Sequence, residues 1–504
     1  MKLKKGMYNL LCGVGTQVIT LAMGIIVPRL ILLGYGSEVN GLLNAVTQIY
    51  GYVALLEAGV GITTIQALYK PIAEKNKRAI SEVYVAAEKY YHRISFYYFI
   101  CVVVLSFVGP FAIKSELNKL DIAVVILLHG LSGVINFYFA ATFKQLLIAE
   151  GKNYVSNIIV FAVQMLTYIS KIVLALIQAN IVFIQISYFV ITVFQVVVYR
   201  TYFKKKYDWL DTNAIANESA LKQKNSFMIH QLVNTVFNST DMIVLSTICG
   251  LASTSIYAVY NLVFSGLFNI LNTLFTSLGF TLGQTYHEDK RRYIELHDSF
   301  ESVYIALVFA LISVCYLLIL PFISLYTAGV NDIAYYDTKL PFLFCMIQLL
   351  SAIRAVASNL INIAQHAKQT IKRAIIEAII NLSISIIAAS VIGIYGVLLG
   401  TIVALLYRAN DIIIYSNIKI LKRSPKRAYM TVGLNFALFF CVVIIEKIVN
   451  IKIQRYIDFI AYGVILTPLM LLMYVGTNML INKMCVSYLK MICSKLLRPL
   501  AKKA

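Results

Sequence analysis

The stretch 344–365, FCMIQLLSAIRAVASNLINIAQ, is an apolar run with a single arginine near its middle. It is long enough to cross a bilayer as a helix. Arg354 is therefore expected near the midplane, where a cation costs about 2.5–3.5 kcal/mol on insertion scales. Polar residues at spacings of three and four form one helical face: Ser351, Arg354, Ser358, Asn362 and Gln365. We expect this face to line a hydrated cavity, which makes Arg354 a candidate substrate contact. The alternative is an arginine that pairs with a buried carboxylate and only holds helices together.

The composition of the 504-residue chain is that of an integral membrane protein. Hydrophobic residues make up 60% of it, charged residues only 13%, and the mean hydropathy is +0.78, which is far more apolar than a soluble domain. The net charge of +21 does not indicate nucleic acid, because most of the 44 Lys and Arg residues lie in alternate loops. That alternation is the charge bias of cytoplasmic loops in membrane proteins.

Fourteen apolar runs are long enough to span a membrane. They lie at about 8–33, 41–69, 92–113, 120–148, 154–178, 180–202, 226–248, 254–285, 300–327, 340–365, 371–392, 395–420, 428–448 and 456–481. The sequence therefore predicts an all-α membrane protein with about 14 transmembrane helices. An even number of spans places both termini on one side, and the charge bias predicts that this side is the cytosol.

The longest polar stretch, residues 203–225, has six spans before it and eight after it. This division suggests two six-helix lobes around a central cavity, related as parallel repeats, plus a C-terminal helix pair. The predicted organisation is an N-lobe at 1–203, a cytosolic linker at 204–225, a C-lobe at 226–421, and helices 13 and 14 with a basic cytosolic tail at 422–504. The tail is expected either to lie on the anionic inner leaflet or to form a disordered end.

Two further predicted spans carry polar faces. The seventh has Gln231, Asn234, Asn238 and Asp241, and the eighth has Asn261, Ser265, Asn269, Asn272 and Thr276. Polar faces of this kind are incompatible with lipid, so they predict a hydrated interior in the C-lobe. The candidate cavity residues are Asn234, Asn238, Asn269, Asn272 and Asn362, together with the arginines.

Some charged residues within the spans have partners close in sequence. Arg408 and Asp411 are three residues apart on one helical face, and Arg373 and Glu377 are four apart. Each pair can neutralise itself, so a structural role is at least as good an explanation as a functional one.

Glu57 and Asp241 have no cation nearby in sequence. They are candidates for Na⁺ or proton coupling, or for pairing across helices with Arg354 or Arg29. Arg29 lies only a turn or two from the predicted outer surface, and it can also extend its head group to that surface.

Motifs of enzymes and ATP-driven pumps are missing from the sequence. It contains no GxxxxGK[ST] phosphate loop, no GxSxG and no HExxH. The eight cysteines are scattered without a CxxC, which argues against metal ligation. The outer loops are too short for a membrane glycan polymerase or ligase. We therefore expect no catalysis, no metal and no cofactor.

Three stretches resemble one family of bacterial transporters. They are ALLEAGVGITTIQALYKPIAEKNK (54–77), FNSTDMIVLSTICGLASTSIYAVYN (237–261) and IIEAIINLSISIIAASVIGIYGVLLGTIVALLYR (375–408). They look like the polysaccharide-biosynthesis or O-antigen flippases of the multidrug/oligosaccharidyl-lipid/polysaccharide (MOP) superfamily. The resemblance extends over nearly the whole chain, and its motifs are mostly Gly and Asn positions within apolar helices.

The resemblance implies a flippase that carries a polyprenyl-pyrophosphate-linked oligosaccharide to the outer leaflet of the bacterial cytoplasmic membrane by alternating access. It implies that Arg354, Arg408 and Arg29 hold the pyrophosphate, that the amides face sugar hydroxyls, and that Na⁺ or H⁺ is coupled. Implied partners are the lipid-linked oligosaccharide, membrane lipids and other polysaccharide-assembly proteins. The alternatives are a cation-coupled multidrug or small-molecule exporter of the same fold, a peptidoglycan-precursor flippase and a structural membrane scaffold.

Overall fold

The computed structural model describes residues 2–57, 60–217, 240–364, 366–448 and 453–481. These residues are helical throughout except for short connections, and no strand occurs among them. Twelve of their helices are long and apolar enough to cross a membrane. The chain forms two compact units, which are described separately: unit 1 is 1–258 with 329–333, and unit 2 is 259–328 with 334–504. The prediction of an all-α, multi-pass membrane protein is confirmed.

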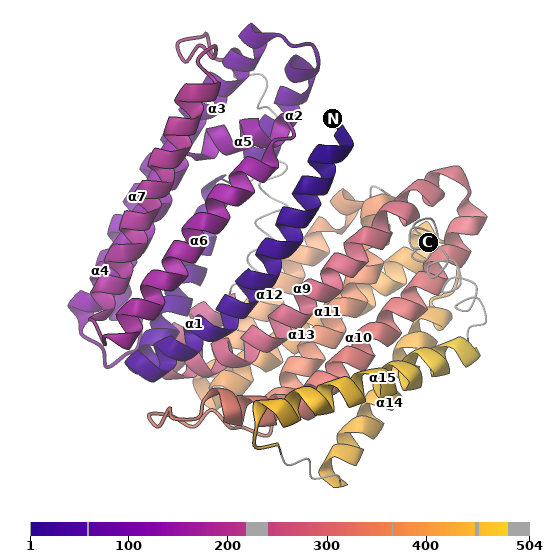
Figure 1. Ribbon diagram of the computed structural model, residues 1–504. Coiled ribbons are helices and arrows are strands. Elements are labelled where there is room, and N and C mark those ends of the chain that lie inside the picture. Colours follow the sequence, from indigo (N-terminus) through magenta and orange to yellow (C-terminus); the bar gives the residue numbers. More distant parts are fainter. Residues whose placement is uncertain (1, 58–59, 218–239, 365, 449–452, 482–504) are drawn as a thin grey trace, which may run out of the picture. The chain divides into compact units, whose positions relative to one another are not determined.

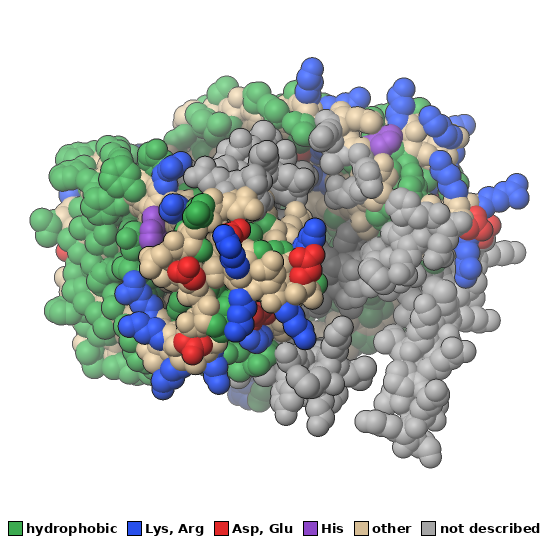
Figure 2. Space-filling model, turned by 90° about the horizontal axis from the view of Figure 1, so that it is seen from above, with side chains coloured by type: hydrophobic (Ala, Val, Ile, Leu, Met, Phe, Trp, Pro, Cys, Tyr) green, Lys and Arg blue, Asp and Glu red, His purple; other side chains and the backbone are tan. Residues whose placement is uncertain are grey.

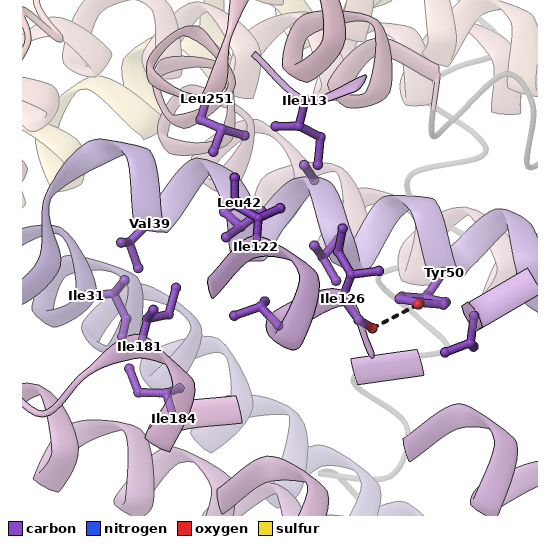
Figure 3. Packing of buried hydrophobic residues seen from close by; sticks show 14 of the residues in the cluster. Ile31, Val39, Leu42, Tyr50, Ile113, Ile122, Ile126, Ile181, Ile184 and Leu251 are labelled. Atoms are coloured by element: carbon purple, nitrogen blue, oxygen red, sulfur yellow. Dashed lines mark hydrogen bonds between the residues drawn. The ribbon is translucent and has the colours of Figure 1, made fainter. Parts of the chain in front are cut away.

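Unit 1 contains the indigo to magenta helices of Figure 1. They are α1 (Lys2–Val53), η1 (Ala54–Glu57), α2 (Val60–Ala73), α3 (Lys77–Ala112), α4 (Lys119–Phe139), α5 (Ala141–Ala149), α6 (Asn153–Leu176), α7 (Ile181–Lys206) and η3 (Leu245–Cys249). One apolar core joins α1, α4 and α7 through Val39, Leu42, Ile122 and Ile184 (Figure 3). At its edge the Tyr50 hydroxyl donates to the Ile126 carbonyl at 2.9 Å.

Helix α1 is broken where the sequence predicts the gap between the first two spans. Gly36 has φ +81° and is not helical, a conformation that favours glycine. The following turn is capped by Asp332, whose carboxylate accepts from the Ser37 N–H at 2.6 Å and from the Ser37 hydroxyl at 2.8 Å. A carboxylate is well placed there, because the first N–H groups of a helix have no partner within the helix.

Unit 2 contains most of α9 (Leu251–Glu288), then α10 (Lys290–Tyr326), α11 (Leu340–Ile363), α12 (Ala367–Ile392), α13 (Ile394–Tyr415), η4 (Ser416–Ile420), α14 (Lys426–Ile448) and α15 (Tyr456–Ile481). The last two helices match the predicted C-terminal pair. They are tied to each other by reciprocal amide hydrogen bonds between Asn435 and Asn478 at 3.0 and 3.2 Å. The Tyr474 and Ser313 hydroxyls, 2.7 Å apart, tie α15 to α10.

Most predicted spans agree with observed helices to within a few residues, but α3 and α10 begin well before the predicted starts at 92 and 300. Two other spans were predicted as single helices and are divided. The span 41–69 is interrupted by η1, and the span 120–148 divides at Ala140 between α4 and α5. Most of the span 226–248 lies outside the described residues, as does the C-terminal tail from 482. The described part of the predicted linker packs on unit 1, where Tyr207 and Leu210 are buried.

Many Lys and Arg side chains are exposed near the ends of helices. Figure 2 looks onto the upper end of Figure 1 and shows many of them, with fewer Asp and Glu. Exposed cations there include Lys75 and Lys77 near the start of α3 and Lys204, Lys205 and Lys206 at the end of α7. These basic segments of the sequence are therefore exposed at the ends of their helices.

Candidate functional site

Helices α12 and α13 approach each other closely because glycine faces the contact. A Cβ on Gly396 would lie 2.2 Å from the Ala388 carbonyl carbon, and one on Gly400 would lie 2.3 Å from the Ser385 hydroxyl. Real Cβ atoms do not approach so closely, so only glycine fits. The two helices are joined at Gly393, with φ +59°. The sequence motif GIYGVLLG thus serves close packing, and this packing brings charged residues of α12 and α13 together.

Charged side chains meet on α11, α12 and α13: Arg354, Arg373, Glu377, Arg408 and Asp411. We call this set the mid-membrane cluster, after the depth that the sequence predicts for Arg354. The Glu377 carboxylate lies between two arginines, 3.3 Å from Arg354 Nη1 and 3.4 Å from Arg408 Nε. Asp411 is likewise shared, 2.9 Å from Arg408 Nη1 and 2.8 Å from Arg373 Nη1. The cluster forms a chain of alternating charges across three helices.

The charges of these five side chains do not cancel. Three arginines face two carboxylates, which gives the cluster one positive charge in excess. Within the described part of the chain, Glu377 Oε1 and Arg408 Nε are buried without a hydrogen-bond partner, although their charges are paired. Buried polar atoms are normally satisfied, so each such atom calls for an explanation. The Glu377 side chain is only 2% exposed and that of Arg354 is 21% exposed, so Arg354 is the accessible end of the pair.

The partners within the cluster differ in part from the sequence prediction. Arg408 does pair with Asp411 as predicted. The predicted pairing of Arg373 with Glu377 is wrong, because Arg373 contacts Asp411 while Glu377 contacts Arg354 and Arg408. The i, i+4 spacing brings two side chains to one face of a helix, but the neighbouring helices here offer closer partners. The pairing of Arg354 with a buried carboxylate is present, and it leaves Arg354 partly accessible.

A second group of polar side chains lies in unit 1, around Glu57 at the end of η1. The Tyr91 hydroxyl donates to Glu57 Oε1 at 2.8 Å, and the Gln145 amide donates to Tyr91 at 3.3 Å. Lys144 lies near enough to act on Glu57 electrostatically. The sequence did not identify three residues of this group as site residues: Tyr91, Lys144 and Gln145. The split of the predicted 120–148 span at Ala140 is what places the last two on the separate helix α5.

The other predicted site residues are spread over both units. Asp241 is buried in unit 1 and accepts from the Tyr257 hydroxyl at 3.0 Å. Arg29 is half-buried on α1, and Asn269 is exposed on α9. Asn234 and Asn238 lie outside the described residues, and so do the side chains of Asn272 and Asn362. Within the described residues, the structure therefore brings together Arg354, Arg408, Glu377 and Asp411 from the predicted set.

A second ion-pair group lies in unit 2 where α10 meets the segment before α14; we call it the α10–α14 cluster. Arg423 donates to both oxygens of Asp298, at 2.6 and 2.8 Å, and Arg427 lies 2.8 Å from the same carboxylate. Burial by itself lowers the pKa of Arg423, but the hydrogen bonds and charge of Asp298 outweigh it and raise that pKa above its usual value. Asp298 also forms, with His297 and Glu301, the one group among the described residues with metal-ligand spacing. Both Asp298 oxygens already accept hydrogen bonds from an arginine and are not free to bind a cation. We therefore interpret this group as an ion-pair cluster and not as a metal site.

Comparisons with known proteins agree with the helical architecture. No protein-family profile and no curated protein matches the sequence. Among solved structures, lipid II flippase MurJ in an inward closed conformation aligns with TM-score 0.67 and 13% identity, over 93% of this chain and 99% of that one. An inward-facing multidrug resistance MATE family transporter of the MOP superfamily aligns with TM-score 0.61 and 13% identity, over 83% and 96%. The chain therefore shares the fold of these two solved structures, while the O-antigen flippase subfamily remains a prediction.

Proposed function

We propose that the protein is a flippase for a polyprenyl-pyrophosphate-linked oligosaccharide or polysaccharide repeat unit. It moves this lipid by alternating access from the inner to the outer leaflet of a bacterial cytoplasmic membrane, with both termini in the cytosol. The bias of Lys and Arg toward alternate loops of the sequence supports this orientation. The fold supports transport of a lipid or of a small molecule, since one neighbour is named a lipid II flippase and another a multidrug transporter.

The observation that carries the proposal is the excess positive charge of the mid-membrane cluster. Arg354 is partly accessible and shares the single carboxylate of Glu377 with Arg408. A pyrophosphate carries more negative charge than one carboxylate and presents several oxygens to a planar guanidinium. It can therefore compete with Glu377 for Arg354, and Arg408 then keeps Glu377 neutralised. Such an exchange of partners gives a site that binds and releases an anion without leaving Glu377 or either arginine buried and unpaired.

Ion coupling is a further part of the proposal. Glu57 and Asp241 are carboxylates of unit 1 that accept hydrogen bonds from tyrosines, Tyr91 and Tyr257. A carboxylate inside a membrane protein is by default a functional group for ion or proton handling. We assign Na⁺ or H⁺ coupling to these two residues, and a Glu57→Gln variant should lose the dependence of transport on an ion gradient.

The direct test is leaflet translocation of a fluorescent polyprenyl-pyrophosphate oligosaccharide in proteoliposomes. Arg354→Ala should slow translocation at least about tenfold, which corresponds to about 1.4 kcal/mol of lost anion contact. Arg291→Ala is the matched control, because Arg291 is exposed at the start of α10. Equal rates for Arg354→Ala and the control would overturn the assignment of Arg354.

The second candidate is a cation-coupled multidrug or small-molecule exporter. The Glu57 group favours it, because a half-buried carboxylate attracts organic cations as well as Na⁺. If the protein moves no pyrophosphate lipid but extrudes organic cations against an ion gradient, this candidate replaces the flippase. A peptidoglycan-precursor flippase differs only in the sugar of the lipid, so a panel of lipid-linked sugars in the same assay separates the two flippase substrates.

A further inference from the structure

A basic pocket opens on unit 1 between α3, α4 and α7, and its described lining contains none of the residues assigned to transport above. Its volume is about 830 Å³. Residues from all three helices line it, and they include His92, Tyr138, Phe139, Arg200, Lys204 and Lys205. The three cations lie in the last two turns of α7, which ends at Lys206. The pocket is therefore at the end of a membrane span, at the level where lipid head groups meet water.

The positive charges of this pocket outnumber the carboxylates among its described lining residues. Arg200, Lys204 and Lys205 are exposed, and none of them forms an ion pair with a carboxylate among the described residues. Among the described lining residues, Glu88 is the only acid, so the pocket carries net positive charge. The Arg200 guanidinium lies over the Phe139 ring, 4.1 Å from its centroid. This contact holds the guanidinium at the mouth of the pocket without using its hydrogen-bond donors.

An apolar track continues from the cations along the outside of α7. Val190, Phe194 and Val197 are 57%, 52% and 52% exposed, and their spacing of four and three residues places them on one helical face. Tyr138 and Phe139, 42% and 36% exposed, add two aromatic rings from α4. The track and the cations together offer a surface for apolar chains that ends in a positively charged pocket. A free anion would use only the charged end of this surface, whereas a phospholipid uses both.

We propose that this pocket binds the head group of an anionic phospholipid, such as phosphatidylglycerol, with the acyl chains along Val190, Phe194 and Val197. The phosphate is held by Arg200, Lys204 and Lys205, and the rings of Tyr138 and Phe139 flank the glycerol region. Basic pockets between transmembrane helices at the cytoplasmic side are the expected place for such lipids. The bound lipid links α3, α4 and α7 and therefore stabilises unit 1. The proposal does not depend on the transported substrate.

The test measures lipid retention on the full-length protein in neutral detergent by native mass spectrometry, with thermal unfolding as the second readout. The triple variant Arg200→Gln, Lys204→Gln, Lys205→Gln removes the pocket cations. The matched control is a second triple variant at the start of α10, where residues 290–292 are three exposed cations: Lys290→Gln, Arg291→Gln, Arg292→Gln. Arg200→Lys keeps the charge and tests whether charge alone suffices.

The wild type and the control triple should prefer phosphatidylglycerol to phosphatidylcholine by about tenfold or more, since each cation near an anionic lipid contributes about 1 kcal/mol. The pocket triple should lose this preference and the thermal stabilisation that comes with it, while keeping the unfolding temperature of the lipid-free wild type. Retention of the preference by the pocket triple overturns the proposal. An equal loss in the control triple also overturns it, because the effect is then diffuse surface charge. Full competition by inorganic phosphate alone shows a site for a soluble anion and overturns the lipid assignment.

Discussion

The two ion-pair clusters of unit 2 use the same chemical groups in different ways. In the α10–α14 cluster, Asp298 is bound by Arg423 through two hydrogen bonds of 2.6 and 2.8 Å and by Arg427 at 2.8 Å. In the mid-membrane cluster, Glu377 lies 3.3 and 3.4 Å from its two arginines. Its Oε1 atom is buried without a hydrogen-bond partner among the described residues. Short, bidentate contacts are the strong kind, so Asp298 is held more firmly by its arginines than Glu377 is by Arg354 and Arg408.

This difference separates a structural cluster from a candidate binding cluster. The α10–α14 cluster ties α10 to the start of α14, where removal of one partner should mainly reduce stability. Both clusters have one positive charge in excess and an arginine whose side chain is 21% exposed, Arg354 in one and Arg423 in the other. The mid-membrane cluster differs in the longer contacts of Glu377, so removal of Arg354 should mainly change anion binding.

Gly400→Leu should disrupt the mid-membrane cluster through its backbone. Any Cβ at this position meets the backbone of Ser385 at 2.7 Å and its hydroxyl at 2.3 Å, so α12 and α13 must move apart. Overpacking of this kind costs about 3 kcal/mol at the upper end of its usual range. Thermal unfolding in detergent measures the loss. The control is Gly433→Ala, which meets nothing within 4 Å, and equal stability of the two variants would refute the close packing.

Asp298→Asn should lower the free energy of unfolding by about 2 kcal/mol, because Arg423 and Arg427 lose their charged hydrogen-bond acceptor. Lipid translocation per folded molecule should stay at the wild-type level. Asp289→Asn is the control, since Asp289 caps α10 by accepting from two backbone N–H groups and Asn caps helices equally well. A large transport defect with unchanged stability would show that the α10–α14 cluster is not merely structural.

Glu377→Gln should increase anion binding by the mid-membrane cluster. It removes the carboxylate shared by Arg354 and Arg408, so the excess charge of the cluster rises. We expect the polyprenyl-pyrophosphate lipid to bind about tenfold more tightly, which corresponds to about 1.4 kcal/mol, and translocation to slow because release is slower. Binding in detergent at two salt concentrations checks the charge dependence. Weaker binding would mean that Glu377 orients the arginines for the substrate instead of competing with it.

Thr401→Val should produce the smallest effect. The Thr401 hydroxyl accepts from the buried Asn381 amide at 2.9 Å, one turn from Glu377 on α12. Loss of one such hydrogen bond costs about 1 kcal/mol. Thermal unfolding should show this decrease, and binding of the lipid should remain unchanged. A change in binding with unchanged stability would extend the site toward Asn381.

The sequence predicted the helices well and the contacts between them less well. Long apolar runs determine where spans lie, and the interval between the runs 8–33 and 41–69 contains the break at Gly36. Hydropathy did not reveal η1 at Glu57 or the division at Ala140, because these residues lie within continuous apolar runs. The break at Ala140 places Gln145 on α5, where its amide donates to Tyr91.

Charge partners were predictable only where both lie on one helix. The Arg408–Asp411 pair follows from spacing. The contact of Glu377 with Arg354 depends on how α11 and α12 are placed in the fold, which spacing along one helix does not encode. Arg373 pairs with Asp411 and not with the predicted Glu377 for the same reason, because Asp411 lies on the neighbouring helix. Sequence therefore identified the charged residues of the mid-membrane cluster, and the close approach at Gly396 and Gly400 explains their partners on α12 and α13.

The most direct measurement is binding of the polyprenyl-pyrophosphate lipid to purified Arg354→Ala and Arg423→Ala proteins, compared with the wild type in the same detergent. We expect about tenfold weaker binding for Arg354→Ala with near-normal thermal stability. For Arg423→Ala we expect lower stability with unchanged affinity of the folded protein. Unchanged binding by Arg354→Ala, or an equal loss of affinity in both variants, would contradict the claim that the mid-membrane cluster is the anion site.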